Sequence, residues 1–321
     1  MNTPPSTLAV VLAFAAVYLI WGSTYLAIRV GIETLPPFAL AASRFAIAGA
    51  LLYGWARWRG AKRPTSHQWW KTALIGTLLL CGGNGLVCLA EETVPSGIAA
   101  LFVATVPIFM VIFERLRFGT TLPLATVLGI ACGFLGMVSL VTVDSAGSPA
   151  PPLFGALLLI GAALSWSYGS VMAKGDSSLP DSPTITTAME MIGGSVALGL
   201  VATLRGEWSA VKIEAVSAAS WVALAYLIVF GSIIAFTAYV WLLHHVSVAS
   251  ASTYAFVNPI VALFLGWWLK SEPLGHSTLL ATALIIAGVI LIHRSRESRS
   301  AESPPTFSPP PAPDTRKVAN R

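Results

Sequence analysis

The residues that point most clearly to a binding site are two prolines that interrupt apolar runs, Pro107 and Pro259. Proline has no backbone N–H, so each one frees a carbonyl group one helical turn earlier, near Val103 and Ala255. In hydrocarbon, a free carbonyl needs a partner, a cavity or a substrate. We therefore expect a binding site where the two interruptions meet, with a simple packing kink as the alternative.

Aromatic and amide side chains in the middle of apolar runs form the second group of candidates. The indole N–H groups of Trp21 and Trp166 need an acceptor away from water, and Asn84 and Asn258 cost free energy there unless they are hydrogen-bonded. Such residues can line a substrate cavity, or they can serve core packing and interhelical hydrogen bonding. The predicted cavity residues are Trp21, Tyr25, Asn84, Pro107, Trp166, Tyr168, Tyr254, Asn258 and Pro259.

Arg44 and Glu190 are charged residues inside apolar runs, which makes both functional candidates. Arg44 could instead form a structural ion pair with Glu91 or Glu92. Glu190 is the candidate for proton coupling, because a buried carboxyl group can take up and release a proton. Its candidate ionic partners are Lys174, Arg115 and Arg117.

Motifs for enzymatic or ATP-driven chemistry are absent from the sequence, which contains no P-loop, no GxSxG and no HExxH. The adjacent His244 and His245 would point about 100° apart on a helix, so they make a poor metal pair. We therefore expect no metal, no cofactor and no enzymatic activity. A membrane-embedded enzyme is the alternative class.

The composition places these candidates in a lipid bilayer rather than in water. The chain is 55% hydrophobic and 10% charged, whereas soluble domains carry about 25% charged residues. Crossing a membrane takes about 20 apolar residues. Suitable stretches lie at roughly 8–29, 38–57, 69–91, 96–117, 121–143, 153–174, 183–204, 217–241, 247–269 and 275–293. The sequence therefore predicts an all-α integral membrane protein with ten transmembrane helices.

Basic residues indicate how these helices are oriented. With the N-terminus in the cytoplasm, most Lys and Arg residues fall in inner loops and in the C-terminal tail, as the positive-inside rule requires. Both termini are therefore expected in the cytoplasm, with the protein in a bacterial inner membrane. This distribution also accounts for the net charge of +5 without nucleic acid. The tail 294–321 is rich in Pro, Ser and charge, so we expect it to be disordered.

The chain is also an internal duplication. An offset of 145 aligns Trp21 with Trp166, and an offset of 152 aligns Pro107 with Pro259. The expected repeats cover 8–143 and 153–293, with five helices each. Because five is odd, the second repeat enters the membrane from the opposite side, which is the inverted arrangement of many secondary transporters.

Several stretches resemble the EamA family of the drug/metabolite transporter (DMT) superfamily, in its YedA-like branch. They include YLIWGSTYLAIRVGIETLPPFALAASRFAIAGALL, NGLVCLAEETVPSGIAALFVATVPIF and ASTYAFVNPIVALFLGWWLKSEPL. The resemblance implies two inverted EamA repeats around a central cavity, and export of amino acids or other small metabolites without ATP. Positions that match the family are Trp21, Arg44, Pro107, Trp166, Asn258, Pro259 and Glu272.

Glu272 departs from the symmetry of the two repeats, because Thr120 stands at the corresponding place in the first one. We therefore expect Glu272 to cap or anchor the outer end of the helix predicted at 247–269, rather than to form half of a functional pair.

The predicted function is that of a secondary transporter, which exports amino acids, related compounds or drugs across the inner membrane by alternating access. Its partners would be a small-molecule substrate, the lipid bilayer and protons as the candidate coupling ion. A passive channel or a subunit of a larger membrane assembly would also be compatible with such a chain.

Overall fold

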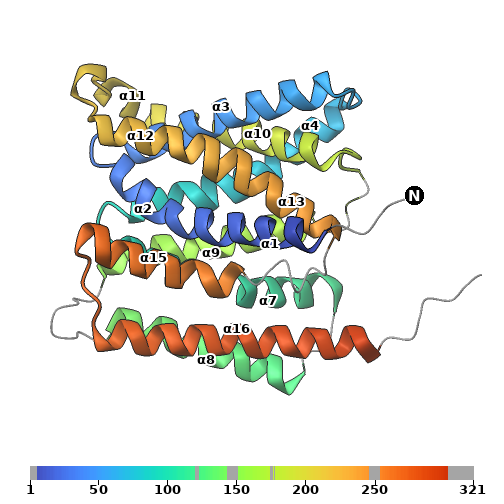
Figure 1. Ribbon diagram of the computed structural model, residues 1–321, viewed down its shortest axis with the longest axis vertical. Coiled ribbons are helices and arrows are strands. Elements are labelled where there is room, and N and C mark those ends of the chain that lie inside the picture. Colours follow the sequence, from blue (N-terminus) through green and yellow to red (C-terminus); the bar gives the residue numbers. More distant parts are fainter. Residues whose placement is uncertain are drawn as a thin grey trace, which may run out of the picture.

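The described part of the chain is helical throughout (Figure 1). The computed structural model describes residues 6–119, 123–142, 151–173, 176, 178–245 and 254–302. The helices of the first half are α1 (Thr7–Ala16), η1 (Val17–Trp21), α2 (Gly22–Gly31), α3 (Pro37–Trp58), α4 (Ser66–Gly76), η2 (Thr77–Gly85), α5 (Leu86–Ala90), α6 (Ser96–Val103), α7 (Val106–Phe118) and α8 (Leu124–Thr142).

The second half continues with the same kind of element. It contains α9 (Leu153–Ala173), α10 (Pro183–Leu204), α11 (Glu207–Ala210), η3 (Ile213–Ala215), α12 (Ala218–Tyr226), η4 (Leu227–Ile234), α13 (Ala235–His245), α15 (Tyr254–Lys270) and α16 (His276–Glu302). Helical residues cover most of each predicted apolar stretch; residues 121–122, 143, 174 and 247–253 lie outside the described residues, and 91, 104–105, 123, 217 and 275 are described but not helical.

Seven helical segments among the described residues are long and apolar enough to cross a membrane. They are Thr7–Gly31, Pro37–Trp58, Ser66–Ala90, Ser96–Phe118, Leu153–Ala173, Pro183–Leu204 and Ala218–Tyr239. Three shorter apolar helices accompany them, at Leu124–Gly136, Val257–Lys270 and His276–Ile292. The all-helical class is thereby confirmed, and an integral membrane protein is the setting that fits such helices.

The outer surface of the bundle is apolar, as a lipid-facing surface must be. Phe154 on α9, Leu200 on α10 and Leu280 on α16 each expose more than half of their side-chain area, at 67%, 61% and 57%. In water, such a surface would cost free energy in proportion to its area. In a bilayer the same side chains meet acyl chains.

Three of the long segments contain a stretch of π-helix: η1 precedes α2, η2 links α4 to α5, and η4 links α12 to α13. A π-helix opens the normal hydrogen-bond ladder and is often found at functional sites. A fourth interruption separates α6 from α7, directly before Pro107. Four of the seven long apolar segments are therefore interrupted in their middle rather than at their ends.

Two helix pairs form opposite edges of the bundle, α3 with α10 and α8 with α16 (Figure 1). Each pair joins a helix of the first half to a helix of the second half. Glycines let the backbones approach closely: a Cβ on Gly288 of α16 would lie 2.5 Å from the carbonyl oxygen of Gly129 on α8. Between helices in lipid, packing at such small residues is a main source of stability.

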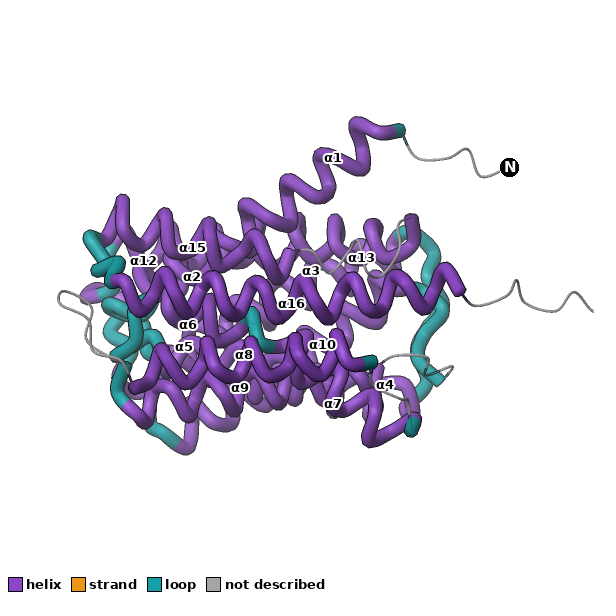
Figure 2. Tube along the Cα trace, turned by 90° about the horizontal axis from the view of Figure 1, so that it is seen from below, coloured by secondary structure: helices purple, strands orange, loops and turns teal. Residues whose placement is uncertain are grey.

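The first described helix, α1, begins on the same side of the molecule on which the last one, α16, ends. The start of α1 and the end of α16 both lie at the right-hand end of Figure 1, together with the loop 59–65 between α3 and α4. We call this the basic end, because the loop and its flanks carry Arg57, Arg59, Lys62 and Arg63. In Figure 2, α1 leans away from the rest of the bundle.

The C-terminal helix corrects one expectation. The segment 294–302, which we predicted to be disordered, continues α16 as far as Glu302. Arg, Glu and Ala are good helix formers, and a helix that is already nucleated extends at little cost. The rest of the predicted tail, 303–321, lies outside the described residues.

The tightest helix crossing provides a test of this packing. A Cβ on Gly76 of α4 would lie 2.0 Å from the backbone carbonyl oxygen of Glu190 on α10. Since backbone cannot rotate away as a side chain can, we expect Gly76→Ala to destabilise the protein by about 1–3 kcal/mol. Thermal unfolding of purified protein in detergent measures this change.

The matched control is Gly199→Ala on α10, where an added Cβ would meet no atom within 4 Å. We expect this variant to unfold at the wild-type temperature or slightly above it. Equal unfolding temperatures for the two variants would show that the α4–α10 crossing is looser than described.

Candidate functional site

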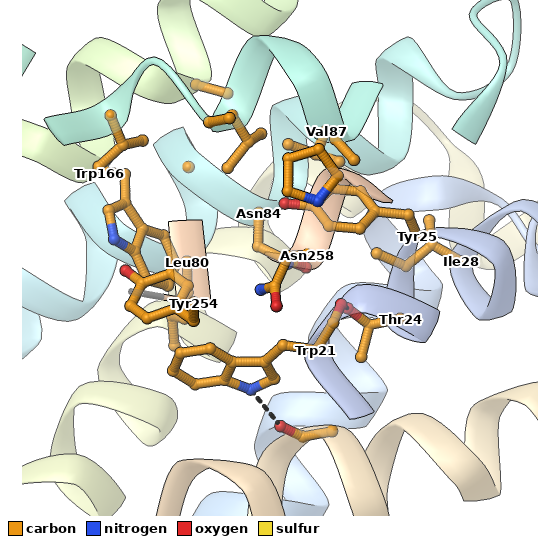
Figure 3. Close-up of a pocket in the computed structure, with 18 of the residues that line it drawn as sticks. Trp21, Thr24, Tyr25, Ile28, Leu80, Asn84, Val87, Trp166, Tyr254 and Asn258 are labelled. Atoms are coloured by element: carbon orange, nitrogen blue, oxygen red, sulfur yellow. Dashed lines mark hydrogen bonds between the residues drawn. The ribbon is translucent and has the colours of Figure 1, made fainter. Parts of the chain in front are cut away.

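A cavity of about 110 Å³ lies in the centre of the bundle (Figure 3). One buried water needs roughly 10–15 Å³ on this measure, so the space accommodates several waters or a small solute. Helices of both halves line it. The predicted site residues found there are Trp21, Tyr25, Arg44, Asn84, Pro107, Trp166, Tyr254, Asn258 and Pro259.

Trp21 is at the end of η1, and its ring forms part of the cavity wall (Figure 3). Its indole Nε1–H donates to the carbonyl oxygen of Gly231 in η4, at 3.1 Å. The ring also packs against Tyr239 and Tyr254, with centroids 5.1 Å away in each case. We expected this indole N–H to need an acceptor. The acceptor is the backbone carbonyl of Gly231, which lies in the π-helical stretch η4 of the other half.

The two asparagines line the cavity from different halves of the chain, Asn84 from η2 and Asn258 from α15 (Figure 3). The Oδ1 atom of Asn84 accepts a weak hydrogen bond from the Cys88 thiol at 3.6 Å. With its amide nitrogen turned toward the neighbouring carbonyls, Asn258 donates to the backbone of Tyr254 and Tyr18, both at 3.2 Å. Hydrogen bonds to its own surroundings hold each amide at the cavity.

The interruption predicted at Pro107 is confirmed. The helix opens at Ala104 and Thr105 and resumes as α7, with Pro107 in its first turn. Val103, whose carbonyl loses its usual donor, lines the cavity. The α9 residue Ser167 bridges the same region by donating to the carbonyl of Val106 at 3.0 Å.

Pro259 lies inside the described part of α15 and also lines the cavity. Residues 246–253, directly before Tyr254, lie outside the described residues. The two prolines therefore both border the cavity.

Arg44 lies on α3 and is 5% exposed. Its Nε–H donates to the hydroxyl of Ser232 in η4 at 2.8 Å, and its guanidinium lies 4.6 Å from the ring centroid of Phe45. The Nη1 atom is buried and has no hydrogen-bond partner. The alternative of a structural ion pair with Glu91 is wrong, because both carboxylate oxygens of Glu91 are buried without a partner as well.

Two predicted site residues lie elsewhere. Tyr168 is 46% exposed on the outer face of α9, where its ring packs against Phe113. Residues two apart on a helix point about 200° apart, so Tyr168 cannot face the cavity that Trp166 lines. Predicting it as a cavity residue was wrong for this reason.

Glu190 is buried in α10, where its backbone meets Gly76 of α4, and it is not part of the cavity lining. Of its candidate partners, Arg117 donates instead to the carbonyl of Val171 at 3.3 Å. Lys174 lies outside the described residues.

Sequence reasoning missed several lining residues, most of which are aliphatic and resemble ordinary residues of a membrane helix. They include Thr24, Ile28, Leu80, Val87 and Phe236. Helical spacing could have identified some of them: Trp21, Tyr25 and Ile28 follow an i, i+4, i+7 pattern, as do Leu80, Asn84 and Val87. Phe236 offers no such signal in the sequence.

The end of the bundle opposite the basic end carries an acidic cluster of two residues, the half-buried Glu272 and the buried Glu91. Glu272, in the loop after α15, accepts hydrogen bonds from the backbone N–H of Ser96 (2.9 Å) and Gly97 (3.1 Å) at the start of α6. A carboxylate at a helix N-terminus is favourable because of the helix dipole. Glu272 thus ties the loop after α15 to the start of α6, so the helix that its carboxylate caps is α6 and not the helix that we predicted.

Glu91 lies just beyond the spanning segment Ser66–Ala90, in the same cluster. Burial raises the pKa of its carboxyl well above the usual value, and the charge of Glu272 adds to this effect. Arg29, which donates to the backbone carbonyl of Glu91, acts in the opposite direction.

The raised pKa of Glu91 predicts a pH dependence of stability. The folded protein holds this proton more tightly than the unfolded chain, so the contribution is complete below the unfolded-state pKa of about 4.3 and is lost as the pH rises through the folded-state pKa. Glu91→Gln removes the ionisation. We expect the variant to gain unfolding temperature relative to the wild type at about pH 8, and to gain less at about pH 5.

Thermal unfolding in detergent at both pH values measures this difference, with Glu92→Gln as the matched control, because Glu92 is exposed. An advantage of Glu91→Gln that does not change between the two pH values would contradict the assigned ionisation.

Comparisons with known proteins agree with this architecture. The EamA-like transporter family matches residues 7–142 and 153–294. The uncharacterized inner membrane transporter YedA of Escherichia coli (strain K12) is 42% identical over 282 residues, which cover 87% of this chain and 89% of YedA. The uncharacterized transporter YoaV of Bacillus subtilis (strain 168) is 26% identical over 288 residues, covering 88% of this chain and 96% of YoaV.

A solved crystal structure of a protein with 22% sequence identity covers 90% of this chain and 98% of its own, with a TM-score of 0.62. At that identity, the likeness concerns the fold alone. The family match extends over nearly all of the helical chain, and YedA is named as a transporter of the inner membrane. This chain belongs to the EamA-like transporter family.

Proposed function

We propose that this protein is a secondary transporter that exports small metabolites, such as amino acids or related compounds, across the inner membrane by alternating access. Its ten helices would form two inverted repeats, 8–143 and 153–293. The observation that carries the proposal is the central cavity, whose walls combine broken helices from both halves. Helices that are opened around a shared cavity are typical of secondary transporters.

One pair of interruptions matches the proposed repeat, which supports the duplication. Shifting η2 (Thr77–Gly85) by the offset of 152 places it on 229–237, which overlaps η4 (Leu227–Ile234). The same offset relates Pro107 to Pro259. Both π-stretches line the cavity, through Leu80 and Asn84 of η2 and Gly231 of η4, and both prolines line it too, although only the helix at Pro107 is interrupted in the described residues.

Polar contacts between the halves at both ends of the bundle offer a basis for alternating access. Opposite the basic end, Glu272 of the second half caps α6 of the first. At the basic end, Lys71 of the first half donates to Asp176 of the second at 2.9 Å. Hydrogen bonds to Ser178 and Lys71 hold the pKa of Asp176 below its usual value. Opening the end opposite the basic end would require Glu272 to leave α6, and opening the basic end would require Lys71 to separate from Asp176.

Protons are the proposed coupling ion, with Glu190 as the group that would carry them. The support is that this carboxyl is buried on α10, one of the two helices at the α3–α10 edge, where the halves meet. A change in its charge would alter the packing free energy of that edge.

A transport assay tests the site. We expect Trp21→Ala, Asn84→Ala and Asn258→Ala each to reduce solute flux in reconstituted vesicles by about tenfold or more, since each removes a group from the cavity wall. The solutes are a broad panel of amino acids and related metabolites. A parallel screen asks which toxic amino-acid analogues cells tolerate when they express the protein.

The matched control is Tyr168→Ala, an aromatic residue of the same helix as Trp166 that faces outward. It should keep wild-type flux and resistance. If wild-type vesicles show no saturable flux for any solute of the panel, the transport proposal fails; leakage that never saturates would indicate a channel instead.

Cysteine labelling tests the orientation. In a background without the native cysteines, we expect Ser209→Cys, in the exposed segment after α10, to react with a membrane-impermeant maleimide in intact cells. Arg63→Cys, in the exposed loop at the basic end, should react only after the membrane is opened. The reverse pattern would place the basic end outside.

A further inference from the structure

Arg44 is the only charged side chain among the described residues that line the cavity. It is 5% exposed, and its guanidinium is always protonated under physiological conditions. A buried charge without a counter-charge is costly, and proteins usually pair it or place it where a ligand completes it. The missing partner of Arg44 is therefore informative about the solute.

The guanidinium is only partly satisfied by the protein. Nε is bonded to Ser232 at 2.8 Å, whereas Nη1 is buried with no acceptor. Leaving a buried charged donor unpaired costs more than leaving a neutral one. An anion that enters the cavity can supply two parallel acceptors, which is the arrangement that a guanidinium binds best.

The backbone around Arg44 is shaped to admit the guanidinium. A Cβ on Gly231 would lie 3.0 Å from Nη2 of Arg44 and 3.0 Å from Cγ2 of Thr24. The carbonyl of the same glycine accepts the indole N–H of Trp21. The opened helix η4 thus holds Arg44 through Ser232 and Trp21 through Gly231, and it brings the cation and the aromatic wall of the cavity together.

The rest of the lining selects the body of the solute. Trp21, Trp166 and Tyr254 provide aromatic surface, and Asn84 and Asn258 provide amide groups. Within the described lining there is no Asp or Glu that could pair with an ammonium group. A zwitterion or a cation would bury its positive charge without a partner, at a cost that a simple anion avoids.

We infer that the cavity binds an organic monoanion with an aromatic or apolar body, and that Arg44 binds its carboxylate or equivalent anionic group. This inference rests on the proposed transport function and narrows its solutes, because it favours simple monoanions over zwitterionic amino acids. Because Nη1 is covered in this conformation, the guanidinium must turn about its side-chain bonds to meet the anion. Its bond to Ser232 is the contact that the anion replaces or supplements.

Three probes with one body and different charge test the inference: phenylacetate, phenylalanine and phenethylamine. Binding to purified protein in detergent is measured by titration calorimetry and by tryptophan fluorescence, because Trp21 and Trp166 lie at the cavity. We expect phenylacetate to bind about tenfold more tightly than the other two, or better. Arg44→Gln should weaken the binding of phenylacetate by about 10- to 100-fold, which is the loss of affinity expected when a charged hydrogen-bonded pair is removed.

Conservative variants separate a binding role from a structural one. Arg44→Lys keeps the positive charge but lacks the two parallel N–H donors of a guanidinium. It should therefore bind phenylacetate more tightly than Arg44→Gln and less tightly than the wild type. Ser232→Ala removes the internal bond of Arg44 and should leave the preference for the anion intact. Tyr168→Phe, outside the cavity, should match the wild type, and each variant is first checked for wild-type elution and unfolding temperature.

Two outcomes would overturn the inference. One is wild-type protein that shows no preference for phenylacetate over the other two probes. The other is an Arg44→Gln variant that still prefers phenylacetate, or whose affinity for all three probes falls by the same factor. In either case, saturable flux of other solutes in the vesicle assay would leave the transport proposal standing, so the two failures are distinguishable.

Discussion

The structure depends on one constraint, that every backbone N–H and C=O in hydrocarbon must find its partner inside the protein. Regular helices meet this constraint alone, but this chain breaks four of its long helical segments near their middle. Each break exposes carbonyl groups that side chains must satisfy. The bond from Trp21 to the carbonyl of Gly231 does so between the two halves of the chain, and the cavity lies where such breaks converge.

Close helix crossings make this arrangement possible. Gly76 against Glu190 and Gly129 against Gly288 bring backbones of the two halves within contact distance. Packing at these edges leaves the broken segments to surround the centre of the bundle, where no crossing fills the space completely. Closely packed edges and an incompletely filled centre suit the alternating-access carrier that we propose, in which the two halves rock around a central solute.

Charge is distributed as sparsely as the bilayer demands. The acidic cluster opposite the basic end is partly neutralised by helix N-termini, as with Glu272 at α6. At the cavity, Arg44 has only Ser232, the ring of Phe45 and, in our inference, the solute itself. Arg44 is therefore not neutralised by an ion pair within the protein, and in our inference its charge binds the solute instead.

From the sequence alone, the apolar runs, the paired prolines and the buried tryptophans could be assigned, because bilayer thickness sets helix length and proline acts through its own backbone. The tertiary structure decided what depends on distant neighbours. It turned Trp166 inward and Tyr168 outward, and gave Arg44 the hydroxyl of Ser232, 188 residues away, instead of Glu91. It also opened η2 and η4, whose sequences carry no proline. Such features follow from how helices rotate and cross, and local sequence does not encode that rotation.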